Sequence, residues 1–176
     1  MKPRGPLMIE HRLIEKMLAV AERRASAMTD EDYDPIFVDA VVDFIKTYAD
    51  RTHHGKEEDI LFTELGAKKL DEADAAAMAE LVEDHRMARA KVAQIVELNE
   101  RYKRGEKKTA AAIKEIIAWL ASFYPAHIRK EDDRFFPDTE RYFAEKELDA
   151  MLERFWEFDK KMIHEKYRQL VATLSS

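Results

Sequence analysis

Six residues combine side-chain types that bind metal ions with a spacing that brings them together. His53 and Glu57 are four residues apart, and so are His127 and Glu131. Because residues at positions i and i+4 lie on one face of an α-helix, each pair directs an imidazole and a carboxylate to the same point. Two further histidines complete the set of candidate metal ligands, which consists of His11, His53, Glu57, His85, His127 and Glu131.

An internal repeat with an offset of 74 residues relates the candidate ligands to one another. The offset pairs each ligand of the first copy with one of the second: His11 with His85, His53 with His127, and Glu57 with Glu131. A fixed offset indicates that one structural unit occurs twice. Each copy is therefore interpreted as a helical hairpin that supplies a histidine from its first helix and a His-x-x-x-Glu pair from its second.

The expected helices place all six side chains at one level of a helix bundle. His11 and His53 would lie about 24 and 27 Å from the loop that joins their helices, at a rise of ~1.5 Å per residue. Burying these groups without partners would cost several kcal/mol each. A pair of metal ions on the pseudo-twofold axis would satisfy them, with both carboxylates free to bridge. Imidazole and carboxylate without thiolate suit iron or manganese, and zinc also accepts this ligand set.

Five long helices are expected to position these residues. Gly and Pro occur only four and five times, and the long stretches without either residue favour long helices. Apolar residues recur at helical spacing throughout, and no alternation typical of strands competes with them. The expected helices span about 6–27, 35–65, 72–103, 110–136 and 143–173, with the fourth ending before Pro137.

The expected fold is therefore all-α, an up-down-up-down four-helix bundle with an internal pseudo-twofold repeat and an additional C-terminal helix. Residues 1–137 are expected to form the bundle. Residues 138–176 are expected to form a helical extension that packs on the same domain.

The composition excludes several other classes of function. The chain of 176 residues has no cysteine, which excludes disulfides, zinc knuckles, iron–sulfur clusters and a cysteine nucleophile. Its net charge is −6, and without a basic tract we expect no nucleic-acid partner. No signal peptide is evident, and no window approaches the ~18 apolar residues of a membrane span. We therefore expect no membrane partner and a cytoplasmic location.

The pattern resembles the hemerythrin-like, His-His-Glu (HHE) cation-binding family over about residues 6–137. The segments that carry the resemblance are His-His-Gly-Lys-Glu-Glu-Asp-Ile-Leu-Phe from residue 53, His-Ile-Arg-Lys-Glu-Asp-Asp-Arg-Phe-Phe-Pro from residue 127, and the histidines at 11 and 85. The resemblance implies a four-helix bundle that holds two iron ions, bridged by Glu57, Glu131 and an oxo or hydroxo group. Members of the family bind oxygen, sense oxygen or iron, store iron, or handle peroxide and nitric oxide.

The sequence departs from the oxygen-carrying members of that family in two respects. Those members have a His-x-x-x-His pair on the third helix, whereas Leu81 and Arg89 stand four residues from His85 here. The second carboxylate is also a glutamate four residues after its histidine, where the carriers have an aspartate one residue further on. His54 offers a substitute nitrogen: it either binds metal, or lies beside the site or at the surface.

The sequence thus predicts a non-haem di-iron protein that binds, senses or reacts with oxygen, peroxide or nitric oxide. The expected partner is a small diatomic ligand or peroxide, and no signal indicates an organic substrate, a redox partner or a signalling partner. The alternative is an iron-storage or iron-responsive module without turnover. Carboxylates next to the candidate ligands are expected to face solvent or to accept hydrogen bonds from ligating imidazoles, namely Glu10, Glu58, Asp84, Asp132 and Asp133.

Overall fold

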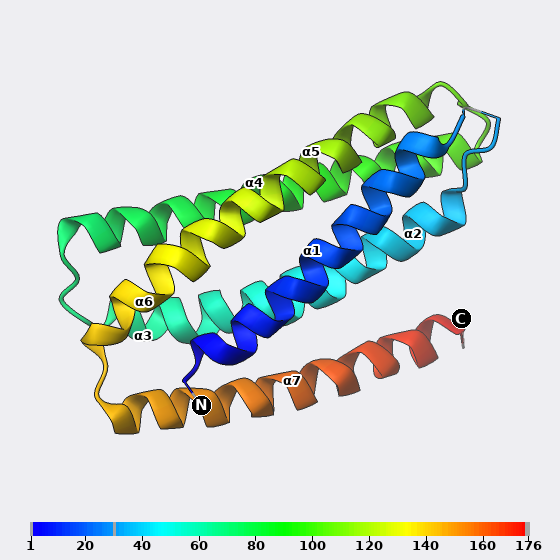
Figure 1. Ribbon diagram of the computed structural model, residues 1–176. Helices are drawn as coiled ribbons and strands as arrows, with labels where there is room; N and C mark the ends of the chain where they lie inside the picture. The colour runs from blue at the N-terminus through cyan, green and yellow to red at the C-terminus, as the bar shows by residue number, and fades with distance from the viewer. Residues whose placement is uncertain (1, 30, 175–176) are drawn as a thin grey trace.

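Helices account for nearly all of the fold in the computed structural model, which describes residues 2–29 and 31–174, with side chains up to residue 166 (Figure 1). The described part contains five long helical stretches and no strand, which confirms the expected all-α class. In chain order they are α1 (Arg4–Ala27), α2 (Pro35–Phe44) with its continuation to Gly66, α4 (Glu72–Lys103), α5 (Thr109–Lys130) with its continuation to Thr139, and α7 (Glu145–Leu174). Among the described residues, no helix is long and apolar enough to cross a membrane.

Local sequence signals set the ends of these helices. The Asp34 carboxylate caps α2 by accepting hydrogen bonds from two backbone N–H groups of the first turn, both at 3.0 Å. Asp71 caps α4 in the same way, at 2.9 Å. Such caps satisfy amide groups that have no partner within the helix. Between α4 and α5, Gly105 has a φ of +106°, a conformation that favours glycine.

Two of the helical stretches widen into π-helical turns. The first continues from α2 through η1 (Ile45–His54), η2 (Glu57–Phe62) and α3 (Thr63–Gly66), and the second continues from α5 through η3 (Glu131–Phe135) and α6 (Phe136–Thr139). The hydroxyls of Thr52 and Thr63 each donate to the carbonyl five residues earlier, at 2.8 and 3.0 Å. These bonds help to satisfy carbonyl groups in turns with i→i+5 spacing.

The sequence predicted that the fourth helical stretch ends before Pro137, and this prediction is wrong. The stretch continues through α6 to Thr139 and then through the 3₁₀ turn η4 (Glu140–Tyr142). A proline within an α-helix normally lacks a donor and clashes with the carbonyl of the preceding turn. Here the preceding turn is the π-helical η3, whose wider spacing relieves that clash.

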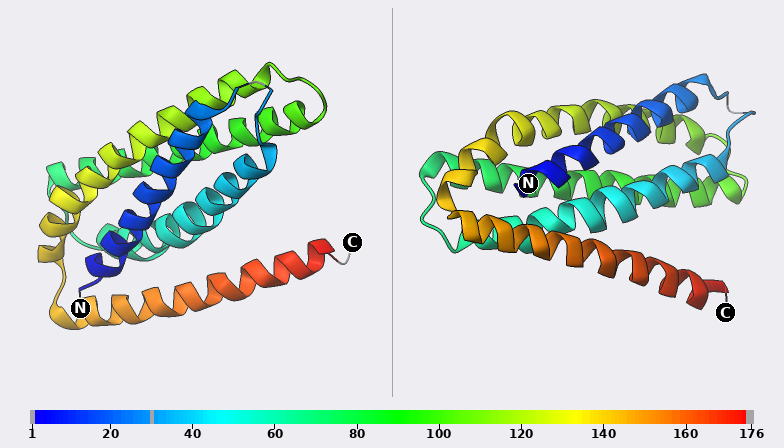
Figure 2. Two further views of the ribbon diagram at one scale, coloured as in Figure 1. Left: turned by 45° about the vertical axis from the view of Figure 1, so that its right-hand side comes forward. Right: turned by 60° about the horizontal axis from the view of Figure 1, so that its bottom comes forward.

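The helical stretches from α1 to α6 form an up-down-up-down bundle, and α7 runs along its outside (Figure 1, Figure 2). α1 and α4 both pack against α5, α2 packs against α4, and α7 contacts η1 and η2. Two buried apolar clusters fill the interior, and α1 contributes Leu7 to one and Ile14 to the other. His11 lies between these two residues along α1, so the polar centre of the bundle is flanked by apolar packing on both sides.

Candidate metal centre

A cluster of buried histidines and glutamates occupies the middle of the bundle. None of its members is more than 2% exposed. They come from α1, η1, η2, α4, α5 and η3. The structure thus brings together all seven residues that the sequence singled out: His11, His53, His54, Glu57, His85, His127 and Glu131.

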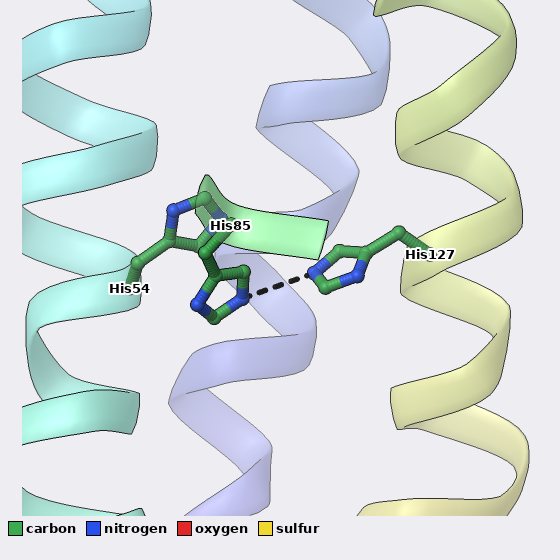
Figure 3. Close-up of side chains that lie close together, drawn as sticks. All are labelled: His54, His85 and His127. Atoms are coloured by element: carbon green, nitrogen blue, oxygen red, sulfur yellow. Dashed lines mark hydrogen bonds between the residues drawn. The ribbon is translucent and has the colours of Figure 1, made fainter. Parts of the chain in front are cut away.

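The cluster divides into two groups, in each of which the ligand atoms lie within 4.8 Å of one another. The first group consists of His11, His53, Glu57 and Glu131, and the second of His54, His85 and His127. Figure 3 shows the second group, whose rings converge from three different helices. The Nε2 atoms of His85 and His127 are 3.2 Å apart. Two ring nitrogens at this distance need a proton or a cation between them.

Glu57 is placed between the two groups. One carboxylate oxygen lies 3.3 Å from Nε2 of His53, which belongs to the first group. The other oxygen lies 3.5 Å from Nε2 of His85, which belongs to the second. This side chain is therefore positioned to contribute an oxygen to a cation in either group.

Glu131 repeats this arrangement in the second copy of the repeat. Its oxygens lie 3.2 Å from Nε2 of His11 and 3.3 Å from Nε2 of His127. Both oxygens of Glu57 and of Glu131, together with Nε2 of His11, are buried and have no hydrogen-bond partner. Buried polar atoms without partners cost several kcal/mol each. The donor set of imidazole and carboxylate therefore fits metal ions, which would satisfy these atoms.

His54 faces the interior rather than the surface. Its ring stacks on that of His85, with centroids 3.8 Å apart and planes 12° apart, and also lies parallel to the ring of Tyr124. Its Nδ1 atom is buried without a hydrogen-bond partner. Because π-helical turns separate consecutive side chains by a smaller angle than α-helical turns, η1 directs both His53 and His54 inward.

Four carboxylates orient the histidines that the repeat relates, and each accepts a hydrogen bond from Nδ1–H. Glu10 binds His53 at 2.8 Å, Asp84 binds His127 at 3.1 Å, Glu58 binds His85 at 2.6 Å, and Asp132 binds His11 at 2.7 Å. This fixes the imidazole tautomer and turns Nε2 toward the centre. Two of these contacts, those of Glu58 and Asp132, cross from one copy of the repeat to the other.

Each orienting carboxylate also pairs with a cationic side chain. The pairs are Asp132 with Arg12, Glu58 with Arg89, Glu10 with Lys56, and Asp84 with Lys130. By contrast, the ion pairs that Glu57 and Glu131 form in the described part of the chain involve histidines only. Their charge therefore remains to be balanced by metal ions or by protons.

The pKa values show where protons reside in the absence of metal. Burial would lower the pKa of His11, but its hydrogen bond to Asp132 and the charge of Glu131 raise it to about 9. Burial would also lower the pKa of His127, but the charge of Glu131 and the hydrogen bond to Asp84 raise it to about 10. These imidazolium groups therefore balance the charge of Glu131 when no metal does.

Aromatic rings enclose the cluster. Phe136 stacks on His11 with ring centroids 5.9 Å apart, and Phe62 stacks on His85 at 6.1 Å. The repeat relates these two pairs, because Phe62 and Phe136 are 74 residues apart, as are His11 and His85. The rings exclude water from the imidazoles, which strengthens electrostatic interactions at the centre.

Sequence reasoning missed several charged residues of this network, among them Lys56 and Asp159. Lys56 is completely buried beside Glu10, and Asp159 of α7 pairs with Lys56 at 2.7 Å. Lys56 could have been found, because it matches Lys130 at the same offset of 74 residues. Asp159 carries no such signal, because the repeat does not extend to α7.

Comparison with known proteins identifies one family. The model of the hemerythrin HHE cation binding domain matches residues 6–139 and, in a second overlapping match, residues 76–175. The second match begins within the second copy of the repeat, on α4. No curated protein and no solved structure matches the chain.

Proposed function

The chain belongs to the hemerythrin HHE cation-binding family, and on this basis we propose that it is a non-haem di-iron protein that binds, senses or reacts with oxygen, peroxide or nitric oxide. The observation that carries the proposal is the position of Glu57 and Glu131. Their unpartnered oxygens lie between two histidine groups, where carboxylates can be shared by two cations.

The two groups would hold one iron ion each. His11 and His53 would bind the first ion, His54, His85 and His127 would bind the second, and Glu57 and Glu131 would be shared. When bound, the two irons would supply one-electron redox chemistry and coordination positions open to a small ligand. The protein contributes imidazoles that are already oriented by carboxylates and an interior from which aromatic rings exclude water.

The burial of the cluster favours a small ligand over an organic substrate. Every candidate ligand is at most 2% exposed, so a diatomic molecule or peroxide is the class of partner that would fit beside it.

Metal analysis tests the di-iron proposal directly. Protein produced in iron-sufficient medium should contain close to two irons per chain, by elemental analysis. A Glu57→Gln/Glu131→Gln double variant is the matched control, because it keeps the shape of both side chains and removes both charges. Repeated isolation with a single zinc and no iron would contradict the proposal.

The second candidate is an iron-responsive module without turnover. It is supported by the unpartnered buried atoms, because folding then depends on the ion itself. Anaerobic stopped-flow mixing of the reduced, iron-loaded protein with oxygen or peroxide separates the two candidates. Rapid, irreversible oxidation favours reaction or sensing, whereas an unchanged spectrum favours the iron-responsive module. Oxygen uptake that vacuum reverses after hours would instead indicate oxygen carriage.

A further inference from the structure

An unbroken line of polar contacts joins α7 to the candidate ligand His53. Lys56 Nζ donates to the Asp159 carboxylate of α7 at 2.7 Å and also to the carboxylate of Glu10. The other oxygen of Glu10 accepts the Nδ1–H of His53 at 2.8 Å. Lys56 is 0% exposed, whereas the Asp159 side chain is 35% exposed. Removing one partner would leave the buried ammonium without part of its charge compensation.

α7 lies directly against the helical segment that carries the ligands. A Cβ atom at Gly55 would come within 2.8 Å of the Phe158 ring of α7, so the absence of a side chain there permits the close approach. Phe155, also on α7, is completely buried in the same apolar cluster as Leu61 of η2. The contact between α7 and the ligand-bearing helix is therefore tight on both sides of Lys56.

The second copy of the repeat lacks this support. Lys130, the counterpart of Lys56, pairs with Asp84 and with Glu80 of α4, at 2.7 and 2.6 Å. The Lys130 and Glu80 side chains are 41% and 59% exposed. The repeat is thus symmetric in its ligands and asymmetric in the network that surrounds them.

We propose that Asp159 is a positioning residue for the metal position formed by His11 and His53. Through Lys56 and Glu10 it fixes the orientation of the His53 imidazole, so that docking of α7 and metal binding at this position stabilise each other. This inference rests on the proposed function, because it requires that the cluster bind metal. It makes the two metal positions inequivalent, with only one of them dependent on α7.

The surroundings of Asp159 show how this residue links α7 to the rest of the bundle. Asp159 and Glu10 line a cavity of about 480 Å³ beside the contact between α7 and η1, together with residues that include Tyr48, Thr52 and Met162. Farther along α7, the pair of Lys166 with Asp43 is exposed to solvent and contributes little. Glu165 pairs with Arg51 of η1 at 2.8 Å, and both side chains are partly exposed. The pair of Asp159 with Lys56 therefore joins this part of α7 to a completely buried cation, which in turn contacts Glu10.

Anaerobic titration with Fe²⁺ or Co²⁺, followed by absorption, tests the proposal in the full-length chain. Asp159→Asn should weaken the binding of one of the two ions by about threefold to tenfold, because Asp159 acts on His53 through Lys56 and Glu10, whereas losses of tenfold or more are typical of groups bonded directly to a ligand. Glu80→Gln is the matched control, because Glu80 pairs with Lys130 as Asp159 pairs with Lys56. Its effect should stay below about twofold, since that pair is solvated.

A double-mutant cycle separates positioning from a general effect on stability. In a Glu10→Gln background the contact to His53 is already weakened, so Asp159→Asn should cause no further loss of metal affinity. Asp159→Glu, which keeps the charge, should restore most of the affinity. Equal affinities in wild type and Asp159→Asn, or additive losses in the cycle, would overturn the inference alone. A wild-type chain that binds no metal would overturn the proposed function and the inference together.

Discussion

At the scale of single residues, the centre of the molecule is organised by charge compensation. Glu57 and Glu131 lack a lysine or arginine partner among the described residues, whereas the carboxylates around them each have one. Charge that is left uncompensated in a buried site must be met by cations or by protons. The arrangement therefore favours the binding of cations at the centre. The imidazoles that bind these cations would be neutral, and the surrounding carboxylates orient them.

Removing the central carboxylates should have a larger effect than removing the carboxylates that orient histidines. Glu57→Ala should abolish binding of at least one ion, because it removes an oxygen from both groups. Glu58→Ala should weaken binding by about tenfold rather than leave it unaffected, because Glu58 orients His85. Metal content and affinity by titration would check both values. Glu83→Ala, at an exposed neighbouring position, should bind as wild type, and equal losses for Glu57→Ala and Glu58→Ala would contradict the assignment.

Metal binding should release protons and become tighter as the pH rises. The pKa values of His11 and His127, about 9 and 10, mean that both imidazoles carry a proton at neutral pH in the metal-free protein. A metal ion requires the unprotonated nitrogen, so binding should release about two protons per chain. His11 and His127 belong to different groups, so each ion displaces one proton and the affinity for each ion should rise about tenfold per pH unit from pH 7 toward 9.

Calorimetry in two buffers with different ionisation enthalpies would measure this proton release. His127→Gln should reduce the release by about one proton, because a glutamine cannot titrate. An affinity that does not change between pH 7 and 9 would contradict the assigned protonation of both imidazoles.

At the scale of elements, the π-helical turns decide which side chains reach the centre. His53 and His54 lie at the end of η1, Glu57 begins η2, and Glu131 begins η3. In a regular α-helix, consecutive side chains diverge by about 100°, and the larger number of residues per turn in a π-helical segment reduces this angle. The wider turns therefore bring the imidazole of His54 to the site as well. This adds a candidate nitrogen ligand although α4 offers no histidine other than His85.

The contact between α7 and η1 should make Gly55 sensitive to substitution. Both Gly55→Ala and Gly66→Ala add a methyl group to a helical position, which on its own favours the helix. The new Cβ at position 55 would lie 2.8 Å from Phe158, whereas nothing lies within 4 Å of one at position 66. Gly55→Ala should therefore be less stable than Gly66→Ala by about 1–3 kcal/mol, as is typical of overpacking.

Urea denaturation followed by circular dichroism would measure that difference. Adding Phe158→Ala to Gly55→Ala removes the atoms that clash and should bring the two alanine variants closer together in stability. Equal stability of the single variants would show that α7 does not constrain this position.

At the scale of the whole molecule, the metal cluster is part of the core rather than an addition to it. It lies between two apolar clusters, and α7 buries Phe155 in one of them. We therefore propose that the bundle of residues 1–137 and the extension 138–176 fold as one unit. The free energy of folding of such a unit includes the free energy of metal binding.

Removal of the metal should lower the stability of the entire chain. At a free-metal concentration 100 times the dissociation constant, binding contributes about 2.7 kcal/mol to the free energy of unfolding. Thermal melting with and without a chelator would show the difference as a lower Tm for the metal-free protein. The double variant Glu57→Gln/Glu131→Gln should melt at the same temperature in both conditions. Identical curves for the wild-type chain, with metal loss verified by elemental analysis, would contradict the expected coupling.

The sequence by itself determined the all-α class, the two related hairpins and six of the residues in the central cluster. These features are local: an i, i+4 spacing places His53 beside Glu57 on any helix, and the same offset of 74 residues relates them to His127 and Glu131. Apolar periodicity and the scarcity of glycine and proline then leave long helices as the favoured elements.

Only the tertiary structure decided which side chains complete the site. The inward direction of His54 depends on the π-helical winding of η1, and the end of the fourth helical stretch beyond Pro137 depends on the widened turn before it. The bond from Glu58 to His85 and the pair of Lys56 with Asp159 join segments far apart in the chain. Such contacts depend on how neighbouring helices are rotated and spaced, which side-chain spacing within one helix does not specify.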